Sequence, residues 1–127
     1  MRLNAGIITA KLEETKNFYV GKLDFQIVWE ADWFILLATP NRQDTISFLI
    51  PDHPTQEISN FQKPFTGNGL YITIEVENVD LYYEKVQKAG IEIALPIRKE
   101  EWGDRHFAIT DPNNIGIDFV THTKPEN

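Results

Sequence analysis

The stretch from residue 102 to residue 120 constrains the fold more than any other part of the chain, because it holds two short runs of alternating apolar side chains. The first run has Phe107 and Ile109 at every second position, and the second has Ile115, Ile117 and Phe119. Alternation with a period of two is typical of a strand with one buried face. The Asp-Pro-Asn-Asn sequence between the runs is typical of a tight turn. The stretch therefore predicts a β-hairpin with Asp118 opposite its apolar face.

The whole chain fits two copies of one order of elements, β-α-β-β-β. In the first copy we expect strands over residues 3–9, 24–30, 33–39 and 45–50, and a helix that Thr9 caps and that ends near Gly21. In the second copy we expect strands over residues 70–76 and 91–97, then the hairpin, and a helix between Asn78 and Gly90. Residues 51–68 are rich in Pro, Asn and Gln, so we expect them to link pseudo-repeats 1–50 and 69–122 within a single domain, 1–127.

The sequences W-G-D-R-H-F, D-P-N-N and I-D-F-V resemble the closing segment of the vicinal-oxygen-chelate superfamily, which contains glyoxalase I, extradiol dioxygenases, and fosfomycin- and bleomycin-resistance proteins. The spelling is closest to the bleomycin-resistance branch. The resemblance implies an α+β fold in which tandem β-α-β-β-β modules form curled mixed sheets that enclose a cleft. Asn114 stands where the family pattern usually has Gly, and Asn tolerates a positive φ, so we expect the turn to persist.

Metal-dependent members of that superfamily hold a divalent ion with side chains on the first and last strands of each half. The resemblance places these positions at Asn4, Ser47, Tyr71 and Asp118. Asp118 is the one usual ligand among them, since amide, hydroxyl and phenol oxygens replace imidazole and carboxylate poorly. We therefore expect no metal and no other cofactor. The alternative is a divalent metal ion with an atypical ligand set that includes Asp118 and His106.

Aromatic and polar side chains near the expected cleft are the candidate ligand contacts. They are Trp33, Phe48, Phe61, Tyr71, Trp102, His106 and Asp118. Phe61 belongs to the expected linker, where it either anchors the loop on the sheet or forms part of a flap over the ligand. His106 is either a hydrogen-bonded or solvent-facing histidine, or a ligand contact or proton carrier. No nucleophile and base can be paired from their spacing, so catalytic residues stay unknown.

Charge and composition exclude several classes of partner. The net charge of −7 argues against nucleic acid, because phosphate binding needs a basic face. No apolar run approaches the roughly 18 residues of a membrane span, and the sequence contains no cysteine. We expect a cytoplasmic protein without a membrane or nucleic-acid partner. The acidity suits a cationic ligand, although solubility alone also explains it.

Three functions from different classes remain open. The first is a metal-free protein that sequesters an amphipathic or cationic small molecule in an aromatic cleft, as the resemblance to bleomycin-resistance proteins implies, and that is no enzyme. The second is a metal-dependent lyase or dioxygenase of the glyoxalase type. The third is a structural or regulatory module whose cleft is filled by its own side chains. The fold alone does not decide between them, and the resemblance also implies a homodimer.

Overall fold

The computed structural model describes residues 1–123, which fall into two compact units, Met1–Thr66 and the described residues from Gly67 onward. Each unit has a mixed four-stranded sheet and a helix, so the α+β fold with a repeated order of elements is confirmed. Residues 51–66, which we expected to link the two halves, belong to the first unit. No helix in the described part of the chain is long and apolar enough to cross a membrane.

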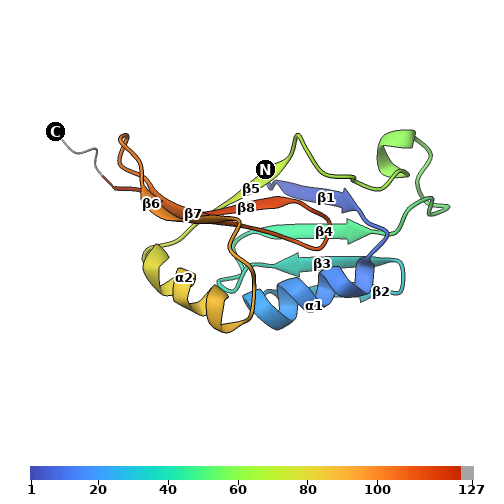
Figure 1. The fold of residues 1–127 in the computed structure, drawn as a ribbon. Coiled ribbons are helices and arrows are strands. Elements are labelled where there is room, and N and C mark those ends of the chain that lie inside the picture. Colours follow the sequence, from blue (N-terminus) through green and yellow to red (C-terminus); the bar gives the residue numbers. More distant parts are fainter. Residues whose placement is uncertain (124–127) are drawn as a thin grey trace. The chain divides into compact units, whose positions relative to one another are not determined.

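In the first unit, helix α1 lies along one face of the sheet (Figure 1). The elements are β1 (Asn4–Ile8), α1 (Leu12–Leu23), β2 (Gln26–Ala31), β3 (Phe34–Ala38), β4 (Thr45–Leu49) and a 3₁₀ helix (Ser59–Phe61). The strand order is β1-β4-β3-β2, in which β1 runs parallel to β4 and the other pairs are antiparallel.

The helical period of α1 explains why it packs on this sheet. Its buried side chains are Thr15, Phe18, Tyr19 and Leu23. Phe18 and Tyr19 follow Thr15 by three and four residues, and Leu23 follows Tyr19 by four, which places them on one side of the helix. The Tyr19 ring lies 5.2 Å from the Phe48 ring of β4 and 5.3 Å from the Phe25 ring. These aromatic contacts form the core of the first unit.

The second unit repeats this arrangement. Its elements are β5 (Tyr71–Glu75), α2 (Val79–Lys88), β6 (Leu95–Lys99), β7 (Arg105–Thr110) and β8 (Gly116–Thr121). The strand order is β5-β8-β7-β6, with β5 parallel to β8 (Figure 1). The predicted cap is confirmed, because the Asn78 side chain accepts a hydrogen bond from the Leu81 backbone N–H. Asn114 takes the expected positive φ, 63°.

The predicted hairpin forms the core of the second unit. Phe107 on β7 and Phe119 on β8 are paired across the strands, and their rings stack at 5.0 Å with 10° between their planes. Tyr83 of α2 lies edge-on to Phe107 at 5.0 Å. The alternation of apolar residues therefore identified the face that the helix covers.

Three boundaries differ from the expectation. Helix α1 starts at Leu12 rather than near Ala10, because the Thr9 hydroxyl accepts the N–H of Lys11 and closes a turn before the helix begins. It continues through Gly21 and ends at Leu23, where the following residue, Asp24, caps it with a left-handed φ of 61°. The strand expected over residues 91–97 lies instead at Leu95–Lys99.

Candidate functional site

Each sheet has one face turned away from the helix of its own unit, and we call this the open face. In the second unit Phe107 and Phe119 point toward α2, so their neighbours on the same strands point to the open face. His106 and Asp118 are two such neighbours. The register adds Arg98 of β6, which pairs with His106, and Thr73 of β5, which pairs with Asp118.

His106 is held between two carboxylates on this face. Its Nδ1 lies 2.7 Å from Asp118 Oδ1, and its Nε2 lies 2.8 Å from Glu100 Oε2. The exposed fractions of the three side chains are small, at 14% for His106, 15% for Glu100 and 29% for Asp118. An ionised carboxylate only accepts hydrogen bonds, so both ring nitrogens donate when both carboxylates are charged. The contacts thus favour the imidazolium form.

The pKa directions agree with this geometry. Burial alone lowers the pKa of His106, but the hydrogen bonds to Asp118 and Glu100 outweigh burial and raise that pKa above its ordinary value. The hydrogen bond from His106 lowers the pKa of Glu100, and Arg98 adds to the effect through a contact of 3.0 Å. The open face of the second unit therefore carries Arg98, Glu100, His106 and Asp118 as one charged network.

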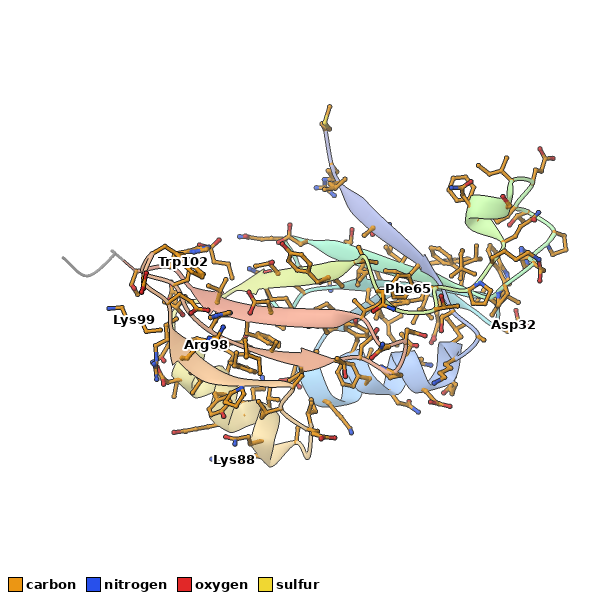
Figure 2. All side chains as sticks on the ribbon, turned by 45° about the horizontal axis from the view of Figure 1, so that its top comes forward. Asp32, Phe65, Lys88, Arg98, Lys99 and Trp102 are labelled. Atoms are coloured by element: carbon orange, nitrogen blue, oxygen red, sulfur yellow. The ribbon has the colours of Figure 1, made fainter. Side chains whose placement is uncertain are left out.

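A second histidine at the end of the same sheet has a similar environment. His122 Nδ1 lies 2.7 Å from Asp104 Oδ1, and His122 Nε2 lies 3.6 Å from Glu75 Oε2. The hydrogen bond between His122 and Asp104 raises the pKa of His122 and lowers the pKa of Asp104. Asp104 also accepts from the indole N–H of Trp102 at 3.1 Å. Figure 2 shows Trp102 beyond the end of the strand that carries Arg98 and Lys99.

The open face of the first unit carries neutral polar groups where the second carries charges. Asn4 donates its side-chain N–H to the Ser47 hydroxyl at 2.9 Å. Asn4 is the first residue of β1, as Tyr71 is of β5, and Ser47 occupies the same place in β4 that Asp118 occupies in β8. The four family positions are thus equivalent by structure, in pairs, in the two units.

These four positions do not fit a divalent metal ion. In the first unit the donors are an amide and a hydroxyl that bond each other, and in the second Tyr71 is a phenol with 73% of its surface exposed. Asp118 is already paired with His106. In the described residues, no group of three His, Asp or Glu side chains is arranged to hold a metal. Amide, hydroxyl and phenol oxygens are poor ligands for the metals that such sites take.

Aromatic rings gather at the β2–β3 end of the first unit. Trp29 of β2 pairs with Leu36, which pairs with Ser47, so Trp29 points to the open face. Its ring lies 6.1 Å from Trp33 and 5.6 Å from Phe34, and Trp33 lies 5.7 Å from Phe34. Trp29 remains 51% exposed. We call Trp29, Trp33 and Phe34 the aromatic cluster.

The expected ligand contacts divide between the two units. His106 and Asp118 are brought together, Tyr71 and Trp102 are exposed in the second unit, and Trp33 joins the aromatic cluster. Phe61 is 50% exposed on its 3₁₀ helix. Phe48 corrects the expectation, because it is fully buried against Tyr19 in the core and offers no surface to a ligand.

Sequence reasoning missed Glu100, His53 and the role of His122. Glu100 pairs with the network because β6 runs to Lys99, whereas the strand was expected to end at residue 97. A strand placed two residues later would have set Arg98 opposite His106. His53, in the loop after β4, stacks on Trp33, and no local sequence pattern predicts this contact.

Comparison with known proteins identifies the family. The model of the Glyoxalase/Bleomycin resistance protein/Dioxygenase superfamily matches residues 3–119. A bleomycin resistance protein from Geobacillus stearothermophilus is 30% identical over 120 residues, which cover 89% of this chain and 90% of that protein. A bleomycin resistance protein from Staphylococcus aureus matches to the same extent.

Solved structures share the fold at lower identity. A glyoxalase/bleomycin resistance protein/dioxygenase from Nocardioides has a TM-score of 0.82 at 18% identity and covers 100% of this chain and 88% of its own. TnmS3, an antibiotic binding protein from Streptomyces, has a TM-score of 0.71 at 19% identity, with coverage of 97% and 96%. Together with the family match over residues 3–119, the sheets and their strand order lead to one conclusion: the chain belongs to the glyoxalase/bleomycin resistance protein/dioxygenase superfamily.

Proposed function

We propose that this protein binds an amphipathic small molecule of the bleomycin kind at the aromatic cluster on the open face of its first unit, and sequesters it without a metal ion and without chemical change. The relatives at 30% identity are bleomycin resistance proteins, and a neighbour in structure is an antibiotic binding protein. Both names support binding as the common role of proteins that resemble this chain.

The aromatic cluster carries this proposal. A half-exposed Trp29 beside Trp33 and Phe34 leaves large apolar rings on the surface of a sheet face. Aromatic rings dominate binding energetics because each can bury a large area, and paired rings gain about 0.5–1.5 kcal/mol beyond that area. The cluster therefore suits a ligand with a flat, apolar part.

A surplus of negative charge in the second unit suits a cationic ligand. Two carboxylates, Glu75 and Asp104, lie around the single His122, whereas Glu100 and Asp118 are balanced by Arg98 and His106. The whole chain carries a net charge of −7. A cation is attracted to such a surface and to an exposed indole such as Trp102.

The metal-free part of the proposal rests on the chemistry of the donors. Asn4 and Ser47 are neutral and bonded to each other, and His106 already neutralises Asp118. A divalent ion at Asp118 would have to displace a protonated histidine, and one at Asn4 and Ser47 would have to accept amide and hydroxyl ligands. We accordingly propose that the cytoplasmic protein works as a binder rather than as a metal-dependent lyase or dioxygenase.

The test is calorimetric titration of bleomycin into protein that has been treated with a chelator. We expect saturable binding, and we expect Trp29→Ala to weaken it about tenfold, since one stacked ring contributes on the order of 1 kcal/mol and its buried area adds to that. Leu81→Ala is the matched control, because Leu81 is an exposed apolar residue on α2, outside the aromatic cluster and off the open face of its own sheet, and should leave the affinity unchanged.

Two results would contradict the proposal in different ways. Absence of heat and of any thermal shift with bleomycin would reject a bleomycin-like ligand, because a ligand at 100 times its dissociation constant stabilises the folded state by about 2.7 kcal/mol. Binding that appears only after Mn²⁺, Fe²⁺, Ni²⁺ or Zn²⁺ is added would reject the metal-free mode.

A further inference from the structure

The loop that follows β4 places a histidine ring flat against the aromatic cluster. The imidazole of His53 stacks on the indole of Trp33, with 4.1 Å between ring centroids and 13° between the planes. The other ring neighbours of Trp33 are tilted or edge-on, at 47° for Phe34 and 73° for Trp29. His53 thus occupies the Trp33 face in the manner of a planar ligand.

The loop is held together by hydrogen bonds that do not involve the His53 ring. The Asp52 N–H donates to the Gln62 carbonyl at 2.9 Å, and the Gln62 side chain donates to the Gln56 carbonyl at 2.9 Å. Lys63 pairs with Asp52 at 3.4 Å. Backbone bonds fix its two ends to the sheet, from Ile50 to Trp33 at 3.1 Å and from Phe65 to Ile8 at 2.9 Å.

Local contacts hold the His53 ring in the stacking orientation. Its Nδ1 lies 2.8 Å from the Thr55 hydroxyl and accepts the Thr55 N–H at 3.3 Å. Pro51 and Pro54 flank it and fix their own φ angles, and Asp52 has a positive φ of 54°. The orientation of the His53 ring is therefore set by its neighbours in the loop and depends little on its contact with Trp33.

We propose that His53 is an internal occupant of the Trp33 face, which it yields to a planar aromatic ring of the ligand. The inference rests on the proposed function and specifies the ligand as one that carries a flat heteroaromatic group. A ring system larger than imidazole covers more of the indole and therefore displaces it, while the loop keeps its own hydrogen bonds. Figure 2 labels Asp32, the residue before Trp33, on the side of the first unit where this loop lies.

The proposal makes His53 a competitor of the ligand. Removal of the ring in His53→Ala should tighten the binding of thioflavin T, a cation that carries a flat benzothiazolium ring system, by about 2- to 10-fold, which is the range of one aromatic pair. His53→Phe supplies a larger apolar competitor and should weaken binding several-fold. Thr55→Val removes the hydroxyl that orients the ring and should give a smaller gain than His53→Ala.

A spectroscopic signal reports displacement directly. In the free protein, the ring current of the Trp33 indole should shift the ring-proton NMR signals of His53 upfield. Saturation with thioflavin T should return these His53 signals to the range of an unstacked imidazole. The spectrum of His53→Ala assigns the signals against those of His106 and His122. Circular dichroism and melting temperature verify that each variant is folded.

Each outcome decides the matter. If thioflavin T and bleomycin both bind but the His53 signals stay in place, or if His53→Ala binds more weakly than the wild type, the displacement is wrong while the binding function stands. If neither compound binds to the wild type or to any variant, the proposed function fails and the displacement fails with it.

Discussion

At the scale of single residues, His106 makes the stability of the second unit depend on pH. Its raised pKa means that the imidazolium stabilises the fold fully below the ordinary value of 6.5, and that this contribution is lost as pH rises through the raised value. The lowered pKa of Glu100 has the opposite sense, with stabilisation present above 4.5 and lost as pH falls through the lowered value. Both contributions to stability are therefore fully present between pH 4.5 and pH 6.5.

We therefore predict that His106→Gln is most destabilising between about pH 4.5 and 6.5 and less so at higher pH, because glutamine cannot place a positive charge between the two carboxylates. Urea unfolding of the wild type and the variant at several pH values from 5 to 9 measures the difference in the free energy of unfolding. A difference that stays constant or grows above pH 7 would show that His106 is neutral in the folded protein.

His122 provides the comparison for this measurement. Its pKa is also raised by a carboxylate, Asp104, but 52% of its side chain is exposed against 14% for His106. Solvent screens an exposed pair more strongly. The variant His122→Gln should thus show the same direction of pH dependence with a smaller amplitude.

At the scale of elements, the turn between β7 and β8 depends on one buried carboxylate. Asp111 is 5% exposed, and its Oδ1 accepts the N–H of Asn113 at 2.8 Å and of Ile115 at 2.9 Å. Asp111→Ala should lower the free energy of unfolding by about 1 to 3 kcal/mol, because buried donors lose their acceptor. Asp111→Asn keeps the side-chain oxygen and should lose less.

Urea titration with a shared m-value separates these two variants. Equal losses in Asp111→Ala and Asp111→Asn would mean that the negative charge, rather than the acceptor oxygen, holds the turn. A loss below about 0.5 kcal/mol in both, the level of an ordinary surface substitution, would show that the turn forms without the side chain.

The elements also show where sequence reasoning holds and where it stops. The order of elements along the chain, the cap at Asn78 and the apolar face of the hairpin follow from local patterns, because caps and period-two alternation are properties of a few neighbouring residues. The orientation of Trp29 does not follow from alternation. Alternation places Trp29 on the same side of the strand as Ile27, but a β-bulge between these residues turns Trp29 to the open face.

The candidate site was predictable to the same degree. His106 and Asp118 share a face because both lie in the well-patterned hairpin. Glu100 and His53 approach from a hairpin end and from a loop, where tertiary contacts decide the side-chain position and no period exists. A site assembled partly from loops is therefore only partly visible in the sequence.

At the scale of the whole molecule, the two units have their edge strands at corresponding positions. The outer strands β2 and β6 carry bulges, and β6 also carries Pro96 and two basic residues, features that protect a sheet edge from pairing. The other edges, β1 and β5, pair with their neighbours in an unbroken register and contain no proline or basic residue. Leu3, just before β1, is 92% exposed.

Edge strands that lack bulges, proline and basic residues, together with exposed apolar residues beside them, suit contact with a second copy of the chain, so we predict the homodimer that the family resemblance implied. Light scattering coupled to size-exclusion chromatography should give about twice the chain mass of 14.7 kDa. Because association stabilises only the folded state, the melting temperature should also rise with protein concentration. A mass of one chain together with a melting temperature that is independent of concentration would mean that β1 and β5 are satisfied within a single chain.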